Sequence, residues 1–380
     1  MHETLRLGHV FGVRVGVNWT VLVIFSLILV GLSTVQFPLL FEGISPAVAW
    51  TAGTVAAVVF FASLLAHELA HAIVARRNGL TVDGVVLWLF GGVALLRGEA
   101  PNPEADLRIA GVGPLVSFVI GVGFTTLALA LGGTDAGVVV GVLGWLGLIN
   151  IVLAVFNLVP AAPLDGGRIL RALLWRARGD RTRAAVAAAR AGRAFGFILV
   201  GFGLVQVLLL PGLGGIWLAL IGWFLTTAAR QEEEQALVQD QLGGLRVADL
   251  MTPTPVTVPP DVTIAAVVED FVMRTRYSAF PVVDDRGRLT GLITLNRMRS
   301  LNAEQRRATY VSDVACERDE IVVAGPDESV TAVLPRLANS PDGRAVVVDE
   351  GRVIGILSPT DISRMLQLSD LWRPAAGGAR

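Results

Sequence analysis

The sequence predicts a polytopic α-helical membrane protein, with about six transmembrane helices and a short membrane-associated β-hairpin, joined to a soluble α/β unit. Three observations predict this fold class. First, 53% of the 380 residues are hydrophobic, only 17% are charged and the mean hydropathy is +0.63, whereas soluble domains are about a quarter charged. Second, long apolar segments dominate residues 15–228. Third, residues 231–380 have a soluble composition and contain an internal repeat.

The apolar segments are interpreted as membrane spans, each of which needs about 20 residues to cross the hydrocarbon core. No small-residue cleavage site follows the first segment, so it is interpreted as an uncleaved span and not as a signal peptide. The predicted spans are residues 15–32, 48–75, 107–131, 137–159, 194–210 and 214–228.

Arginine distribution predicts the orientation. Arginines gather at the N-terminus, in residues 76–97 and 168–193, and after residue 229, and are absent from the loops 36–45, 132–135 and 211–215. The positive-inside rule then predicts a multi-pass protein of the cell membrane with both termini in the cytoplasm. Because this rule also explains the arginine run, and the net charge is −1, no nucleic-acid partner is expected.

The second span carries two of the four histidines, as His67-Glu68-x-x-His71. Positions i and i+4 share one face of a helix, so both imidazoles can bind one zinc ion, with Glu68 beside them as general base. Burying charged groups near a bilayer centre costs roughly 2.5 to 3.5 kcal/mol each, so such residues indicate function. The alternative is a chance motif on a soluble core helix.

A third ligand is expected, because a catalytic zinc site has three protein ligands and one open position for water. The fourth span ends in a segment where Pro160, Pro163 and a glycine pair stop the helix and deliver Asp165. Asp165 is the predicted third ligand. Its alternative use is as the N-cap of a helix over residues 166–178.

Residues 80–97 are apolar but too short to span, and Asp83-Gly84 and Gly91-Gly92 interrupt them. They are interpreted as a hairpin or re-entrant segment. Non-helical backbone at membrane depth survives only against protein or a water-filled cavity, so we expect this element beside the metal site. The alternative is a loop at the cytoplasmic surface.

The soluble part contains two similar units, which open at Val247 and, 64 residues later, at Val311. Each predicts a strand, a helix, two further strands and a closing helix. The predicted elements are 255–258, 264–273, 279–284 and 289–293 in the first unit, and 321–324, 330–338, 345–349 and 353–357 in the second, with closing helices near Arg297 and Asp361. The expected domains are a membrane domain 1–230, a helical linker 231–244, repeats 245–305 and 306–370, and a disordered tail 371–380.

These motifs resemble the site-2 protease family of intramembrane zinc metalloproteases, in the prokaryotic group with a C-terminal tandem of CBS domains. The resemblance covers nearly the whole chain. Its motifs are His67-Glu68-x-x-His71, Gly113-Pro114, and Asn157 with Pro160, Pro163 and Leu164-Asp165-Gly166. The resemblance implies one Zn²⁺ per chain, with His67, His71 and Asp165 as the metal ligands. It implies that Glu68 and Asn157 are catalytic residues, with Asn157 near the substrate carbonyl. It also implies that the hairpin receives the substrate, at Gly91 and Gly92.

The implied activity is that of a zinc metalloendopeptidase. It would hydrolyse peptide bonds within or near the transmembrane segments of single-span, membrane-anchored regulatory proteins, which is regulated intramembrane proteolysis. A helical substrate must unwind before its carbonyls can react, and an edge strand near Gly91-Gly92 can capture the extended form by strand addition.

The C-terminal repeats resemble a CBS pair, a module that often binds adenine nucleotides, and the resemblance implies a homodimer through these domains. Ser358-Pro359-Thr360-Asp361 matches the hydroxyl-x-x-aspartate motif, which assigns cofactor binding to Ser358 and Asp361, with Asp361 placed for ribose hydroxyls. The first repeat has Arg297 where the acid is expected, so at most one adenine nucleotide site is implied. A purely structural or dimerising role is the alternative.

Two other function classes are compatible with apolar spans and a CBS tail. A CBS-regulated channel or transporter needs neither a glutamate beside the first histidine nor Asp165 on a broken segment. A metal-dependent membrane sensor would bind zinc without cleaving peptides. Zinc content together with cleavage by the wild type and by Glu68→Gln separates the three.

Overall fold

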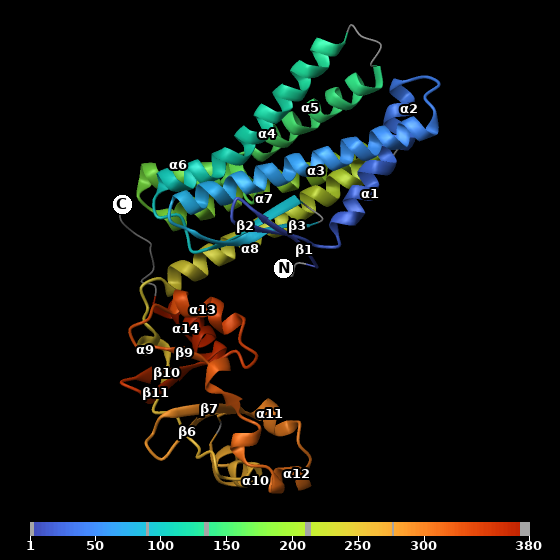
Figure 1. Ribbon diagram of the computed structural model, residues 1–380. Coiled ribbons are helices and arrows are strands. Elements are labelled where there is room, and N and C mark those ends of the chain that lie inside the picture. The colour runs from blue at the N-terminus through green and yellow to red at the C-terminus, as the bar shows by residue number, and fades with distance from the viewer. Residues whose placement is uncertain (1–3, 89–90, 133–136, 210–213, 276, 373–380) are drawn as a thin grey trace, which may run out of the picture. The chain divides into compact units, whose positions relative to one another are not determined.

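A computed structural model describes residues 4–88, 91–132, 137–209, 214–275 and 277–372 (Figure 1). The chain divides into two compact units, Met1–Ala236 and Leu237–Arg380. The division falls inside the predicted linker, and α8 (Gly214–Leu242) passes through it as one continuous helix. The predicted tail 371–380 lies almost entirely outside the described residues.

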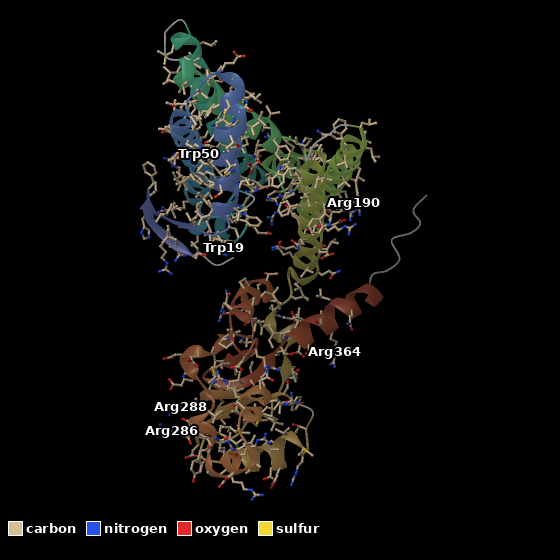
Figure 2. All side chains as sticks on the ribbon, turned by 90° about the vertical axis from the view of Figure 1, so that its right-hand side faces the viewer. Trp19, Trp50, Arg190, Arg286, Arg288 and Arg364 are labelled. Carbon is tan, nitrogen blue, oxygen red and sulfur yellow. The ribbon has the colours of Figure 1, made fainter. Side chains whose placement is uncertain are left out.

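The first unit is built mainly of long apolar helices. Within the described residues, five helical segments are long and apolar enough to cross a membrane: Val21–Leu40, Pro46–Arg77, Pro103–Leu131, Gly137–Asn157 and Arg181–Leu209. The first segment consists of α1 (Val21–Gly31), the π-helical turn Leu32–Gln36 and α2 (Phe37–Leu40). The other four are α3, α4, α5 and α7, in that order. The amphipathic α6 (Asp165–Arg178) lies between α5 and α7 in the sequence. Large apolar side chains on these helices point outward, Trp50 among them (Figure 2). This is the pattern of a membrane protein.

Local sequence signals explain where α3 and α4 begin. At α3, the Ser45 side chain accepts a hydrogen bond from the Val48 amide, and Pro46 follows at the first helical position. At α4, Asn102 accepts from the Ala105 amide over 2.8 Å, with Pro103 next. A polar N-cap followed by proline satisfies an orphan N–H and fixes φ for the first turn.

The predicted start of the first span, residue 15, is wrong. Residues Leu5–Val10 and Val13–Val17 form an antiparallel hairpin, β1 and β2, and α1 begins only at Val21. In Val13–Val17 the valines alternate with Arg14 and Gly16, which is the period of a strand with one buried face. Counting apolar residues alone merged this strand with the helix that follows.

These strands belong to a four-stranded sheet in the order β1-β2-β3-β4. Strand β2 pairs in parallel with β3 (Thr81–Trp88), and β3 pairs antiparallel with β4 (Gly91–Arg97), from Thr81 opposite Arg97 to Trp88 opposite Gly91. The sheet packs on the C-terminal half of α3 (Figure 1), where Val15 and Val85 contact Leu69 and Ala72. Strand β4 is therefore an edge strand held against the helix that carries the histidines.

The second unit contains the two repeats. The first comprises α9 (Val247–Leu250), β5 (Thr252–Pro253), α10 (Ile264–Ala266), β6 (Ala279–Val283), β7 (Leu289–Thr294), α11 (Leu295–Arg299) and α12 (Ala303–Ala308). The second comprises β8 (Cys316–Glu317), β9 (Val322–Ala324), α13 (Val330–Ala338), β10 (Ala345–Asp349), β11 (Arg352–Leu357) and α14 (Pro359–Trp372). The sheets are ordered β5-β11-β10-β9 and β6-β7-β8, so each repeat adds its opening strand to the sheet of the other.

Two predicted elements of the first repeat differ from the structure. The strand 255–258 is reduced to one bridge between Val258 and Val282. The helix 264–273 is a short α-helix followed by a π-helical segment, Val267–Val272. The only cysteine, Cys316, lies in β8 of the second repeat and is buried. Burial together with a hydrogen bond to Glu320 raises its thiol pKa to about 11, so it is a core residue and not a reactive thiol.

Candidate metal centre

The two histidines and Asp165 converge, although Asp165 lies more than 90 residues further along the chain. Asp165 Oδ2 is 3.2 Å from Nε2 of His67 and 3.2 Å from Nε2 of His71, and the two Nε2 atoms are 3.1 Å apart. Both histidines are buried, and 13% of the Asp165 side chain is exposed. Among the described residues, they form the one group of three or more His, Cys, Asp or Glu side chains with converging ligand atoms.

The donor set fits zinc. Tetrahedral bonds of about 2.0–2.1 Å place neighbouring ligand atoms about 3.3 Å apart, close to the distances observed. His71 Nδ1 donates to the Ile109 carbonyl over 2.6 Å, since a carbonyl can only accept. In the neutral ring Nε2 then carries a lone pair, and it faces the other two ligands. His67 is held in the same way, with Nδ1 2.9 Å from the hydroxyl of the buried Ser117, an arrangement typical of metal-binding histidines.

Helix α4 supports both histidines along one face. Ile109, Gly113 and Ser117 are four residues apart, so they lie above one another on that face. A Cβ built at Gly113 would overlap the imidazole nitrogens of both His67 and His71, so only glycine permits this approach. Sequence reasoning noted Gly113 but missed Ile109 and Ser117. A main-chain carbonyl carries no signal in sequence, and one serine in an apolar span is a weak one.

The packing at Gly113 makes a prediction. Gly113→Ala should weaken zinc binding about tenfold, because α4 must move away from the rings that it orients. Gly111→Ala is the matched control, since a Cβ at Gly111 on the same helix meets nothing within 4 Å. Chelator competition with the purified proteins measures the affinity. Equal zinc affinity in the two variants would contradict the proposed contact.

Glu68, beside the ligands on α3, is covered by β4. A Cβ built at Gly92 would overlap the Glu68 side chain and lie 2.9 Å from its Oε1. Gly91, which precedes it, has a φ of +131°, a conformation that favours glycine. The structure therefore places this glycine pair, predicted as substrate-binding, at the general-base candidate.

The turn before α6 delivers Asp165 toward the histidines. The N-cap of α6 is Leu164, without a capping side chain, so the alternative role of Asp165 as N-cap is wrong. A Cβ at Gly166 would overlap the Val159 carbonyl, and one at Gly167 would overlap the backbone of Ala162. The glycine pair is therefore needed for α6 to begin this close to the turn.

Asn157, the last residue of α5, is half-buried, and its amide nitrogen donates to the Leu153 carbonyl over 3.0 Å. Among the described residues, the Asn157 side chain is therefore hydrogen-bonded to its own helix and not to His67, His71 or Asp165.

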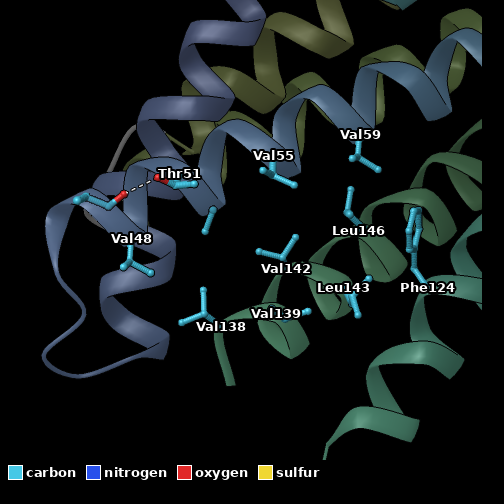
Figure 3. Close-up of a pocket in the computed structure, with 12 residues that line it drawn as sticks. Val48, Thr51, Val55, Val59, Phe124, Val138, Val139, Val142, Leu143 and Leu146 are labelled. Carbon is cyan, nitrogen blue, oxygen red and sulfur yellow. Dashed lines mark hydrogen bonds between the residues drawn. The ribbon is translucent and has the colours of Figure 1, made fainter. Parts of the chain in front are cut away.

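An apolar cavity of about 510 Å³ lies elsewhere in this unit, between the N-terminal halves of α3 and α5 (Figure 3). Val48, Val55, Val142 and Leu146 are among its walls, and the hydroxyl of Thr51 already donates to the Ala47 carbonyl. Its described lining residues offer no group for metal binding or proton transfer.

In the second unit, Ser358 and Asp361 of the hydroxyl-x-x-aspartate motif line a small cleft together with Thr252, Tyr277 and Arg344. Asp361 accepts hydrogen bonds from the Ser358 amide at 2.9 Å, the Ser358 hydroxyl at 2.5 Å and the Thr252 hydroxyl at 3.0 Å. These bonds fix the carboxylate at the cleft.

The corresponding position of the first repeat is filled from within the chain. Asp342 accepts from the Thr294 hydroxyl at 3.0 Å and from Arg297 Nε at 3.3 Å. In the first repeat, Arg297 therefore stands where the hydroxyl-x-x-aspartate motif has its aspartate, and it is paired with Asp342 of the same chain.

A buried histidine pair with a carboxylate, and a glutamate next to the first histidine, define a metallopeptidase site on membrane-type helices. Residues 55–137 and 132–201 match the model of Peptidase family M50, and residues 247–303 and 311–368 match the CBS domain model. The chain belongs to peptidase family M50, the site-2 proteases, and carries tandem CBS domains.

Two relatives agree with this assignment. "Putative zinc metalloprotease Rip3" of Mycobacterium tuberculosis is 43% identical over 376 residues, covering 98% of this chain and 95% of the relative. A zinc metalloprotease of Methanocaldococcus jannaschii is 31% identical over 371 residues, covering 98% of each. The solved structure of the site-2 protease from that organism is 30% identical, with a TM-score of 0.42, and covers 60% of this chain and 94% of its own.

Proposed function

We propose that the protein is an intramembrane zinc metalloendopeptidase that cleaves single-span, membrane-anchored regulatory proteins within or near their transmembrane segments. The observation that carries this proposal is the convergence of His67, His71 and Asp165 beside Glu68, with both histidines on α3, a helix long and apolar enough to cross a membrane. The test is whether membrane peptides stay intact, and zinc stays bound, when Glu68 is replaced by glutamine. The channel or transporter alternative explains none of these four residues.

Each site residue has a defined role in this proposal. His67, His71 and Asp165 hold the metal, which when bound supplies a Lewis acid and a water of lowered pKa. Glu68 takes a proton from the attacking water and delivers it to the leaving amine. Asn157 donates to the oxyanion that develops on the substrate carbonyl. Its amide nitrogen has two N–H groups, so one can make this bond while the other stays on the Leu153 carbonyl.

The free edge of β4 is the proposed substrate platform. A substrate helix hides its carbonyls in internal hydrogen bonds and must unwind before reaction, and an edge strand can then bind the extended segment through main-chain hydrogen bonds. Gly92 lies directly against Glu68, so a segment paired with β4 near Gly91 and Gly92 would pass close to the general base. This role requires the β3–β4 hairpin to lie at membrane depth.

The proposed topology has six spans and places both termini in the cytoplasm. The sixth span is the apolar first half of α8, residues 214–228, added to the five helices of spanning length. With this arrangement the arginine-rich loops all face the cytoplasm. The C-terminal unit would then follow the last span on the same side of the membrane.

The C-terminal unit is proposed to bind one adenine nucleotide at Ser358 and Asp361 and to form a homodimer through its CBS domains. The cleft at Asp361 supports a single site, because Arg297 and Asp342 are paired with each other at the equivalent position.

Replacing Asp361 by asparagine should weaken nucleotide binding about tenfold, since a charged acceptor for the ribose hydroxyls is lost. Arg297→Ala is the control and should leave the affinity within about threefold, because Arg297 has an internal partner. Calorimetric titration of the full chain in detergent with ATP, ADP and AMP measures this. If no nucleotide gives heat with the wild type, the tail has a structural or dimerising role instead.

A further inference from the structure

A cluster of arginines and carboxylates joins four helices next to the metal centre. At its centre is Asp106 of α4, which is fully buried. Arg171 of α6 binds it with two parallel hydrogen bonds, Nε to Oδ2 at 2.9 Å and Nη2 to Oδ1 at 2.8 Å. Arg168 adds a longer contact of 3.4 Å. A bidentate arginine–carboxylate pair fixes orientation as well as distance, so this bond determines how α6 docks on α4.

Asp106 belongs to the face of α4 that orients the histidines. It precedes Ile109 by three residues, and Gly113 and Ser117 follow at intervals of four, so all four lie in one stripe. Ile109 and Ser117 hold the rings of His71 and His67, while Asp106 holds α6. Helix α6 begins at Asp165, and Arg171 lies nearly two turns, about 9 Å, beyond that ligand. The Asp106–Arg171 bond therefore connects the helix that orients the histidines to the helix that carries Asp165.

The helix that leads to the C-terminal unit contacts the same arginine. Glu232 Oε1 of α8 is 3.8 Å from Arg171 Nη1. Burial raises the pKa of Glu232, against the lowering influence of Arg171 and Arg168, so its charge depends on the arginines beside it. The neighbouring Glu233 bonds to two arginines of α7, to Arg193 at 2.9 Å and to Arg190 at 3.3 Å.

Ten residues further along α8, Leu242 is fully buried in the core of the C-terminal unit, where Val238 also packs. One unbroken helix thus carries both the acid at Arg171 and a core residue of the other unit.

We propose that Arg171 is a positioning residue for the metal centre, shared between Asp106 and Glu232, so that the placement of α8 influences the position of Asp165. This inference rests on the proposed zinc site. In this proposal, a change that shifts α8 would move Glu232 relative to Arg171, the residue that binds α6 to α4. The C-terminal unit could influence the active site in this way. A ligand on that unit can have this effect only if it prefers one placement of α8 over another.

The test compares zinc affinity, by chelator competition, and the visible absorption of the cobalt-substituted protein, using the full chain in detergent. Arg171→Gln is expected to weaken zinc binding about tenfold, the usual effect of losing a residue that supports a ligand, and to change the cobalt spectrum. Glu232→Gln is expected to weaken it about threefold, because its contact with Arg171 is longer and more exposed.

Arg176→Gln is the matched control. Arg176 pairs with Glu104 at 3.6 Å, and this pair joins the same two helices but is largely exposed, so both readouts should stay as in the wild type. Arg171→Lys keeps a positive charge beside Asp106 without the bidentate bond, so it should recover the affinity only in part. It also supplies the measurement if Arg171→Gln does not accumulate in folded form.

The outcomes separate the inference from the function on which it rests. If the wild type binds no zinc, or if His67→Ala does not remove the zinc that it binds, the proposed metal site is wrong. If the wild type does bind zinc that His67→Ala removes, but the folded Arg171 variants keep wild-type affinity and spectrum, or Arg176→Gln has an equal effect, the positioning role is overturned. If only Glu232→Gln has no effect, the connection to α8 is overturned.

Discussion

Glu68→Gln is expected to reduce peptide cleavage by about 100- to 10,000-fold, the usual contribution of a general acid–base group. Glutamine keeps the shape of the side chain beside Gly92 and His67 but cannot accept the proton of the attacking water. Zinc should stay bound, because Glu68 is not among the three converging ligands. The measurement pairs zinc content with cleavage of a transmembrane peptide by the full chain in detergent or vesicles.

Glu104→Gln is a suitable control for that experiment. Glu104 is an exposed acid in the first turn of α4, so its replacement should leave both cleavage and zinc content unchanged. Retained proteolysis in Glu68→Gln would remove Glu68 from the role of general base. If the wild type cleaves the peptide, and Glu68→Gln keeps zinc but loses cleavage, the sensor alternative is also rejected, because a sensor would not cleave the peptide in the wild type.

Asp165→Ala is expected to remove most of the bound zinc, as are His67→Ala and His71→Ala. Each change leaves two ligands where a catalytic zinc site needs three. Metal analysis of the purified proteins gives the result directly, and re-adding zinc to protein stripped by a chelator tests whether loss is reversible in the wild type.

Thermal unfolding of Asp165→Ala separates loss of a ligand from loss of structure. Because Asp165 does not cap α6, the zinc-free wild type and the zinc-free variant should unfold at similar temperatures. Full zinc occupancy in Asp165→Ala would reject it as the third ligand, whatever the stability.

Local patterns were enough to single out the three side chains that the structure brings together. The spacing of His67 and His71 places them on one helical face in any helix, and the proline and glycine break before Asp165 marks a residue delivered at a chain turn. The contacts that orient these ligands could not be predicted in this way. The Ile109 carbonyl and the Ser117 hydroxyl are brought to the rings by the docking of α4 on α3, which depends on tertiary packing and has no local pattern.

Fold elements were predicted where one period dominates the sequence. Most long helices follow from apolar runs, and the strands of the second repeat follow from short β-branched segments such as Ala345–Asp349. Helix α7 is an exception, because it begins at Arg181, ahead of the predicted span 194–210, in a segment that contains four arginines. The hairpin β1–β2 was missed because its apolar residues adjoin those of α1 without a strong break. The helix after Thr263 was predicted as regular, yet most of it is π-helical, and nothing in Val267–Val272 signals the wider turn.

The exchange of opening strands in the C-terminal unit bears on how that unit folds. Strand β5 of the first repeat completes the sheet of the second, and β8 of the second completes the sheet of the first. One apolar cluster also takes Leu292 from the first repeat and Val346 from the second. Neither copy has a finished sheet alone, so the two must gain and lose structure together. The division near residue 305, visible in the sequence as the end of one copy, is therefore not a boundary between independently folding pieces.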